Sequence, residues 1–411
     1  MESKKQALST EAYKGVRDFF PQDMFVQKYI FRTMRTVVES FGYVEYGASV
    51  LEPADLYRGK TSSEIVNEQT YTFTDRGERE VTLRPEMTPT VARMIAGKRH
   101  ELATPIRWYS IPNLFRYERP QRGRLREHWQ LNADMFGVSD IEAEIEMVTI
   151  AYRIMIAFGV KPEQFEIRVN NRAHVQQELA KLVKDESLVA DAIRLIDRKE
   201  KMKPEQFDSE WTKLSNKPFV VWKGQLDDFT ATLQTRGVVN CVFDPFLMRG
   251  FDYYTGIVFE VFDKNPENNR SLFGGGRYDN LLSLFGGDSI PAVGFGMGDV
   301  TMRDVLETYQ LLPTYRASAD LYLCRAQGAT IANLNTLADR LRAQGVFVAV
   351  DITERKIGDQ IRSADKQKIP FITVIGEEEL KSHTYKIKKL SNGEEQTLPE
   401  DGIAAFVSTR T

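Results

Sequence analysis

The chain has 411 residues, of which 42% are hydrophobic and 27% are charged, and its formal net charge at pH 7 is -3. This length and composition are typical of a globular protein with two or three domains. The net charge lacks the strong basic excess of most nucleic-acid-binding proteins, so any RNA contact has to be local and no DNA partner is expected. No stretch approaches the roughly 20 apolar residues of a membrane helix, and the first fifteen residues lack the apolar core of a secretory signal. We therefore expect a cytoplasmic protein with no membrane partner.

Cysteine and histidine usage argues against a metal centre. The only cysteines, Cys241 and Cys324, lie in separate apolar, strand-like runs, which excludes a disulfide framework and a cysteine zinc site. The four histidines show no metal-ligand spacing with one another or with a cysteine. They are His100, His128, His174 and His383. No metal bound by protein side chains is expected.

Residues 1–318 predict a domain built on an antiparallel sheet flanked by helices. Apolar residues recur at helical spacing from Phe25 to Val38, and residues 44–52 follow as a strand. Short strand-like runs alternate with Gly, Pro and Asn turns over 71–137, which favours antiparallel pairing. A long helix with an acidic first turn is predicted over 140–160.

Two further segments follow in chain order. Helical patterns fill 171–236 before strands resume, which predicts a helical insertion within the first domain. Composition changes near residue 318, and the apolar strands 321–326, 347–352 and 371–376 then alternate with helices. Such alternation predicts parallel pairing, and hence a separate α/β domain over 319–411.

Two short stretches break these patterns. "MRGFDYYTG" (248–256) interrupts a run that otherwise predicts sheet, and its consecutive Tyr253 and Tyr254 can share one layer only if Gly250 bends the strand. "GFGMG" (294–298) has the spacing G-x-G-x-G, which does not match a dinucleotide-binding loop. Close packing of a strand against the following helix is the preferred explanation for its glycines.

An arginine-rich segment spans residues 114–137, with arginines at positions 116, 119, 122, 124 and 126. One interpretation is a solvated hairpin whose arginines pair with Glu118 and Glu127. The other is an anion site, because guanidinium groups match phosphate oxygens in bidentate geometry. Strand alternation places Arg116 and Glu118 on one face of a first strand, and Gln130, Asn132 and Asp134 on one face of a second. Such a cluster predicts a ligand that carries both signs of charge.

Four segments, in this order along the chain, resemble class II aminoacyl-tRNA synthetases and, among them, the histidyl-tRNA synthetases. Residues 82–88, "TLRPEMT", resemble the amino-acid-binding strand, and residues 115–137 resemble motif 2. "RGFDYYTG" (249–256) and "GGGRYDNL" (274–281) resemble the two histidine-specific signatures. The tail resembles the family's anticodon-binding domain, and the helical block falls where its insertion domain belongs.

The resemblance implies that ATP, with Mg²⁺, activates L-histidine to histidyl-adenylate, and that histidine then passes to the 3' end of tRNA(His). It also implies a homodimer. Two alternatives stay open. The first is a regulatory paralogue that binds histidine without aminoacylation, which Thr301 supports because it stands where the family's motif 3 arginine is expected. The second, a class II synthetase for another amino acid, is opposed by the two signatures.

The resemblance also implies site residues. Tyr254 and Asp134 would bind the two imidazole nitrogens, and Arg116 and Arg249 would form a catalytic pair on the α-phosphate. The implied histidine-binding residues are Glu86, Thr88, Gln130, Asp134, Tyr253, Tyr254 and Tyr278. The implied ATP-binding residues are Arg116, Glu118, Arg124 and His128, the last in place of a phenylalanine that often stacks on adenine. Arg119 and Gln121 lie where motif 2 approaches the tRNA acceptor end.

Overall fold

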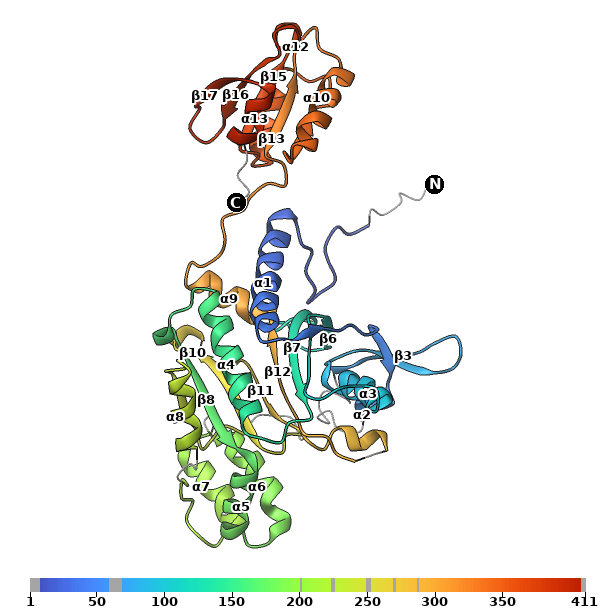
Figure 1. Cartoon of the computed structure of the whole chain (residues 1–411). Coiled ribbons are helices and arrows are strands. Elements are labelled where there is room, and N and C mark those ends of the chain that lie inside the picture. The colour runs from blue at the N-terminus through green and yellow to red at the C-terminus, as the bar shows by residue number, and fades with distance from the viewer. Residues whose placement is uncertain are drawn as a thin grey trace, which may run out of the picture. The chain divides into compact units, whose positions relative to one another are not determined.

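A computed structural model gives the structure of the chain (Figure 1). It describes residues 8–58, 69–199, 202–222, 226–248, 253–268, 271–286 and 288–407. The chain forms two compact units, residues 1–313 and 314–411. Of the described helices, none is both long enough and apolar enough to span a membrane.

The first unit contains helices and strands from α1 to α9. Its helices are α1 (Pro21–Ser40), α2 (Asp55–Arg58), α3 (Thr88–Lys98), α4 (Glu142–Ala157), α5 (Arg172–Leu182), α6 (Val189–Asp197), α7 (Pro204–Leu214), α8 (Asp227–Thr235) and α9 (Asp299–Thr308). Its strands are β1 (Val44–Glu45), β2 (Leu51–Pro53), β3 (Tyr71–Thr74), β4 (Glu80–Leu83), β5 (Ile106–Ser110), β6 (Asn113–Phe115), β7 (Glu127–Phe136), β8 (Phe165–Asn171), β9 (Cys241–Phe243), β10 (Ile257–Asp263), β11 (Ser271–Arg277) and β12 (Ala292–Gly298). Short 3₁₀ helices are η2 (Pro162–Gln164), η3 (Glu186–Leu188), η5 (Pro266–Asn268) and η6 (Leu282–Phe285).

The main sheet has the strand order β1-β5-β7-β12-β11-β10-β8-β9, and β6 pairs with β7. Its central pairs are antiparallel, as predicted, whereas β1 pairs in parallel with β5 and β8 in parallel with β9. The sheet is therefore mixed. The single strand predicted over 44–52 is wrong, because β1 joins this sheet and β2 joins a small β2-β4-β3 sheet.

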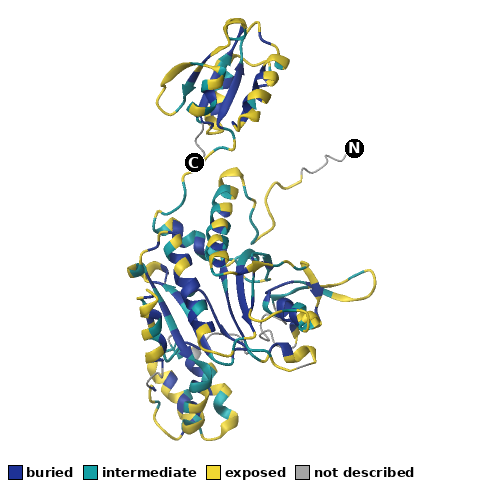
Figure 2. Cartoon of the chain, viewed as in Figure 1, coloured by how far each residue is buried: buried dark blue, intermediate teal, exposed yellow. Residues whose placement is uncertain are grey.

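One face of the main sheet is covered by helices α1, α4 and α9 (Figure 1). Alternation along β7 sends Leu131, Ala133 and Met135 into this helix-covered core. Helix α4 is apolar on most of its surface, because it packs under both α1 and the sheet. Figure 2 shows this buried layer in dark blue. The even-numbered residues of β7 face the other side of the sheet.

The helices α5 to α8 form the connection between the parallel neighbours β8 and β9. Part of this block has its own apolar cluster, which includes Val175, Leu179, Phe207 and Trp211. Because two parallel strands cannot be joined by a tight turn, a long crossover is required here, and the helical block supplies it.

The second unit is a smaller α/β fold with its own core. Its elements are β13 (Leu321–Arg325), α10 (Ile331–Ala343), β14 (Val348–Val350), α11 (Ile357–Lys366), β15 (Phe371–Ile375), α12 (Glu377–Ser382), β16 (Thr384–Lys389), β17 (Glu395–Pro399) and α13 (Glu400–Val407). The sheet order is β14-β13-β15-β16-β17. The predicted parallel pairing is confirmed for β13, β14 and β15, and an antiparallel hairpin, β16-β17, extends the sheet.

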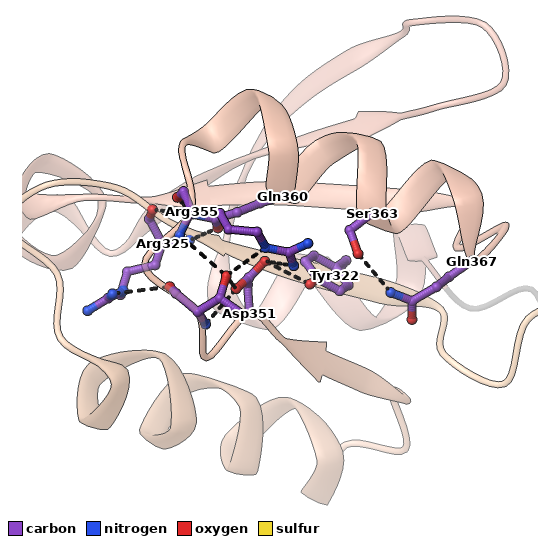
Figure 3. Close-up of polar contacts among 8 residues, drawn as sticks. Tyr322, Arg325, Asp351, Arg355, Gln360, Ser363 and Gln367 are labelled. Atoms are coloured by element: carbon purple, nitrogen blue, oxygen red, sulfur yellow. Dashed lines mark hydrogen bonds and ion pairs between the residues drawn. The ribbon is translucent and has the colours of Figure 1, made fainter. Parts of the chain in front are cut away.

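A polar network holds the loops that follow β13 and β14 (Figure 3). The buried Gln360 side chain accepts the Arg325 backbone N–H at 2.7 Å and donates to the carbonyl of Arg355 at 2.8 Å. The buried Asp351 carboxylate accepts from the Tyr322 hydroxyl at 2.9 Å and from Arg355 at 3.2 Å. These bonds fix the carboxyl ends of two parallel strands against the start of α11.

Candidate active site

The candidate site lies on the face of the sheet that is opposite to α1 and α4. Gln130, Asn132 and Asp134 project from this face of β7, as alternation predicts. In the antiparallel register with β12, Gly296 stands opposite Asn132 and Gly294 opposite Asp134. The centre of the site is thus a row of polar side chains beside a row of glycines.

The glycines of β12 leave room for these side chains. A Cβ atom added to Gly294 would lie 2.1 Å from Asp134 Oδ1, and one added to Gly296 would lie 2.4 Å from Gln130 Nε2. The explanation of "GFGMG" as close packing against the following helix is therefore wrong for these two positions. At both positions the nearest atom to the added Cβ belongs to a side chain of β7.

A cavity of about 110 Å³ opens on this row. Every residue that the resemblance implies for histidine binding lines it, together with Arg116. These residues are Glu86, Thr88, Arg116, Gln130, Asp134, Tyr253, Tyr254 and Tyr278. Asn132 lines it too; alternation had placed Asn132 on this face, but no role had been assigned to it.

Glu86 and Thr88 reach the cavity from the start of α3, which begins at Thr88 directly after the turn that follows β4. Glu86 is buried, and its Oε2 accepts a hydrogen bond from the Tyr253 hydroxyl at 3.3 Å. The hydroxyl of the buried Tyr57 donates to the Glu86 carbonyl at 3.4 Å, so both the backbone and the side chain of Glu86 are held in place.

Tyr253 and Tyr254 both line the cavity, although they are consecutive in sequence. Residues 253–256 form a turn before β10, so strand alternation does not apply to them. The two rings are buried and their centroids lie 4.9 Å apart. The bend expected at Gly250, and Arg249 and Asp252, lie outside the described residues.

Asp134 is one of the two carboxylates that line the cavity, beside Glu86. It is buried, and its Oδ1 accepts a hydrogen bond from the Tyr278 hydroxyl at 2.5 Å. Burial raises the pKa of Asp134 to about 7, and the Tyr278 bond opposes part of that rise. Burial and the Asp134 charge both raise the pKa of Tyr278, so this phenol stays protonated as a donor.

The arginines of residues 116–126 have different environments. Arg116 donates through Nε to the Pro85 carbonyl at 3.0 Å and has no carboxylate partner among the described residues. Arg124 lies 3.6 Å from Glu118, and Arg122 binds Asp304 at 2.8 Å. The hairpin interpretation is therefore right for Arg124, whereas Arg116 is free to meet an external anion.

Strand β6 ends at Phe115, so the prediction that Arg116 and Glu118 share one face of a strand is wrong. Arg116 nevertheless reaches the cavity, while Glu118, Arg124, Arg119 and Gln121 do not line it. The last two are exposed to solvent on the loop beyond β6.

His128 precedes this row on β7. Burial, then the positive charges of Arg116 and Arg17, lower the pKa of His128 to about 3, so the imidazole is neutral at physiological pH. Thr301, on α9, donates to the backbone carbonyl of Leu272 at 3.0 Å and adds no positive charge to the site. Arg17 was not singled out from the sequence, because its segment carries no motif.

The chain is similar to known protein families along most of its length. A family model described as histidyl-tRNA synthetase matches residues 15–210 and 170–300, and an anticodon binding domain model matches residues 325–410. The chain is 40% identical over 419 residues to the histidine–tRNA ligase of Leptospira biflexa, with 95% of each chain covered. The chain belongs to the histidyl-tRNA synthetase family.

Solved structures agree on the histidyl-tRNA synthetase fold. A histidyl-tRNA synthetase from a Nostoc species matches with a TM-score of 0.81 at 23% identity, and 98% of this chain and 100% of that chain are covered. A Bacillus halodurans structure, titled as an ATP phosphoribosyltransferase regulatory subunit/histidyl-tRNA synthetase, has a TM-score of 0.68 at 23% identity, covering 87% and 97%. Because both kinds of protein share the fold, the full-length identity to a ligase is what favours the ligase over the regulatory paralogue.

Proposed function

We propose that the protein is a class II aminoacyl-tRNA synthetase that activates L-histidine with ATP and transfers it to tRNA(His). The observation that carries this proposal is the cavity itself. It combines a buried carboxylate and phenol pair, Asp134 and Tyr278, with a guanidinium, Arg116, that no described carboxylate neutralises. A zwitterionic amino acid with a polar side chain fits the first part, and a phosphate fits the second.

Histidine would bind with its imidazole between Asp134 and Tyr254. The Asp134 carboxylate accepts one ring N–H, and the Tyr254 hydroxyl bonds the other nitrogen. Glu86, Thr88 and Gln130 take the α-amino group. A site that pairs both ring nitrogens rejects analogues lacking them by roughly 10⁴ to 10⁵, because a mismatch leaves buried polar groups unpaired.

Activation proceeds by attack of the histidine carboxylate on the α-phosphorus of ATP, which breaks the bond to the β-phosphate and releases pyrophosphate. The carboxylate is already ionised at neutral pH, so this step needs no general base. It needs orientation and positive charge on the phosphoryl oxygens. Arg116 supplies that charge, with Arg249 as its partner. A ribose hydroxyl of the terminal tRNA nucleotide then attacks the adenylate, and AMP leaves.

Mg²⁺ belongs to the substrate in this proposal. Among the described residues no three His, Cys, Asp or Glu side chains are grouped so as to hold a metal ion. In this proposal the ion arrives as MgATP on the phosphate oxygens. His128 stacks on the adenine as a neutral ring, and Glu118 and Arg124 bind the outer parts of the nucleotide.

tRNA would contact both units. Arg119 and Gln121 are exposed on the motif 2 loop, where they can meet the acceptor end. In the second unit, a groove of about 510 Å³ includes Arg325, Arg355 and Lys356. Such a local basic groove supports anticodon binding by a chain whose net charge is -3. We also infer a cytoplasmic homodimer, which the exposed apolar side chains of Val44, Leu51 and Phe73, on the short strands β1, β2 and β3, support.

The decisive experiment measures exchange of labelled pyrophosphate into ATP by the purified chain. We expect exchange only when histidine is present, and charging of a tRNA with a GUG anticodon. The matched control is Asp134→Ala, which keeps Arg116 and should lose the exchange that histidine supports in the wild-type chain. Exchange that responds equally to other amino acids, or that never occurs, contradicts the proposal.

A further inference from the structure

A buried ion pair joins the segment before α1 to the start of α9. Asp299 is the first residue of α9, and its side chain is almost fully buried. Its carboxylate accepts hydrogen bonds from Arg17 Nη2 at 2.8 Å, from Gln27 Nε2 at 2.9 Å and from the Trp129 backbone N–H at 2.9 Å. Arg17 is therefore held in one position by a carboxylate that is itself fully bonded.

The Arg17 guanidinium keeps donors to spare. Its Nε is buried and has no hydrogen-bond partner among the described residues. The side chain is 19% exposed, so part of it reaches solvent. The guanidinium also lies over the Phe19 ring, 5.0 Å from its centroid, and Phe19 packs edge-on against Trp129 at 5.3 Å. A buried N–H without a partner is uncommon in folded proteins and points to a ligand or a bound water.

The position of Arg17 is next to the site described above. Trp129, which Asp299 bonds, lies on β7 between His128 and Gln130, and Gln130 lines the cavity. Gly298, the residue before Asp299, pairs in register with Gln130. The positive charges of Arg17 and Arg116 both lower the pKa of the His128 imidazole. Both cations therefore act on the same neutral ring, which precedes the cavity residue Gln130 on β7.

We propose that Arg17 is a second cation of the nucleotide site, and that its guanidinium binds the polyphosphate of ATP beside His128. This inference rests on the proposed function, since it names a residue for the same nucleotide. Arg116 lies at the amino-acid end, where the α-phosphate has to be. Arg17 enters from a different segment and would bind phosphate oxygens farther along the chain of phosphates.

The Asp299 carboxylate offsets part of this charge, but it leaves Arg17 Nε without a hydrogen-bond partner among the described residues. It shares its negative charge among three donors, and it lies at the amino end of α9, where the helix dipole offsets part of it. Its physical role is to fix the guanidinium before the ligand arrives. A fixed guanidinium loses little conformational freedom when it binds a phosphate.

The test is the Arg17→Met substitution, which keeps an unbranched apolar stem and removes the charge. We expect the KM for ATP in pyrophosphate exchange to rise about 10-fold or more, because a hydrogen bond to a charged group is lost. The KM for histidine should change little. Arg17→Lys should recover most of the ATP affinity, since it restores the charge.

The matched control is Arg303→Met. Arg303 also joins α9 to α1, through Asp23 at 3.0 Å, but among the described residues no hydrogen bond or ion pair joins it to a residue of the cavity. A merely structural role for Arg17 predicts that both Met variants lower the melting temperature and leave the KM for ATP unchanged. That result overturns the inference.

Two further readouts separate the possibilities. Inhibition of exchange by adenosine should be equal in the wild-type chain and in Arg17→Met, whereas an equal loss of adenosine and ATP binding would overturn the assignment to phosphates.

The chain has only four histidines, so the His128 ring can be followed by NMR, and its pKa should rise in Arg17→Met but not in Arg303→Met. A wild-type chain without exchange rejects the proposed function, while normal exchange with an unchanged ATP KM in Arg17→Met rejects this inference alone.

Discussion

The role proposed for Asp134 in histidine binding requires a buried negative charge, and such a charge destabilises the folded chain. A carboxylate in a buried position with one phenol as its donor is costly, which is why its pKa rises to about 7. Its raised pKa stabilises the folded state at pH values below the ordinary carboxyl pKa, and that contribution is lost as the pH rises through about 7. Bound histidine would compensate by donating an N–H to the ionised form.

The pH dependence of histidine use follows from this group. We expect kcat/KM for histidine to fall as the pH is lowered through about 7, because a protonated Asp134 has lost its negative charge and is a weaker acceptor for the imidazole N–H. The free imidazole titrates in a similar range. The comparison is therefore with Asp134→Asn, which should show only the substrate's own titration and a higher KM. Identical pH profiles for the two proteins would contradict this role for Asp134.

At the scale of elements, the β7-β12 pair forms the floor of the cavity because β7 carries the polar side chains and β12 has glycines at the paired positions. Gly294 and Gly296 are needed for the space above them, since neither has a backbone conformation that demands glycine.

Gly296→Ala tests this pairing. Its new Cβ would collide with the Gln130 amide, 2.4 Å away, so Gln130 has to leave its place over β12. We expect the KM for histidine to rise about 10-fold, as for the loss of one hydrogen bond to a charged group, while the fold is retained. Gly298→Ala on the same strand is the control, because the nearest atom to its Cβ is Thr301 Oγ1 at 3.7 Å. Equal effects of the two substitutions would contradict the packing argument.

The sequence was informative about elements with a regular period. Alternation along β7 placed Gln130, Asn132 and Asp134 on one face correctly, and the α/β period predicted β13, β14 and β15. The sequence did not predict the structure of segments that have no regular period. The turn at Tyr253 follows no repeat, and the separation of β1 from β2 depends on pairing with distant strands. Arg17 was missed because its importance comes from Asp299, which is 282 residues away in sequence.

At the scale of the whole molecule, each unit has its own core. The apolar clusters of the first unit end at Leu312, and those of the second begin at Ala317. Among the described residues, none that lines the candidate cavity comes from the second unit. We therefore expect histidine activation and recognition of the far end of a tRNA to be separable.

A chain that ends at Pro313 should keep histidine-dependent pyrophosphate exchange and lose most tRNA charging, because the basic groove at Arg325 and Arg355 is removed. Both activities are measured on the same preparation, alongside the full chain. Charging that survives the truncation unchanged would show that the second unit does not contribute to tRNA binding.

The helical connection between β8 and β9 has a consequence for how the protein is made. β9 is a short edge strand, and it can pair with β8 only after the intervening helices have brought it back. This closure joins Ile167 to Cys241 across the whole helical block, so it should follow the formation of the local helices. Until it occurs, one side of β8 presents unpaired backbone groups to other chains. Damage within the helices would thus cost yield through self-association, even where the catalytic cavity is intact.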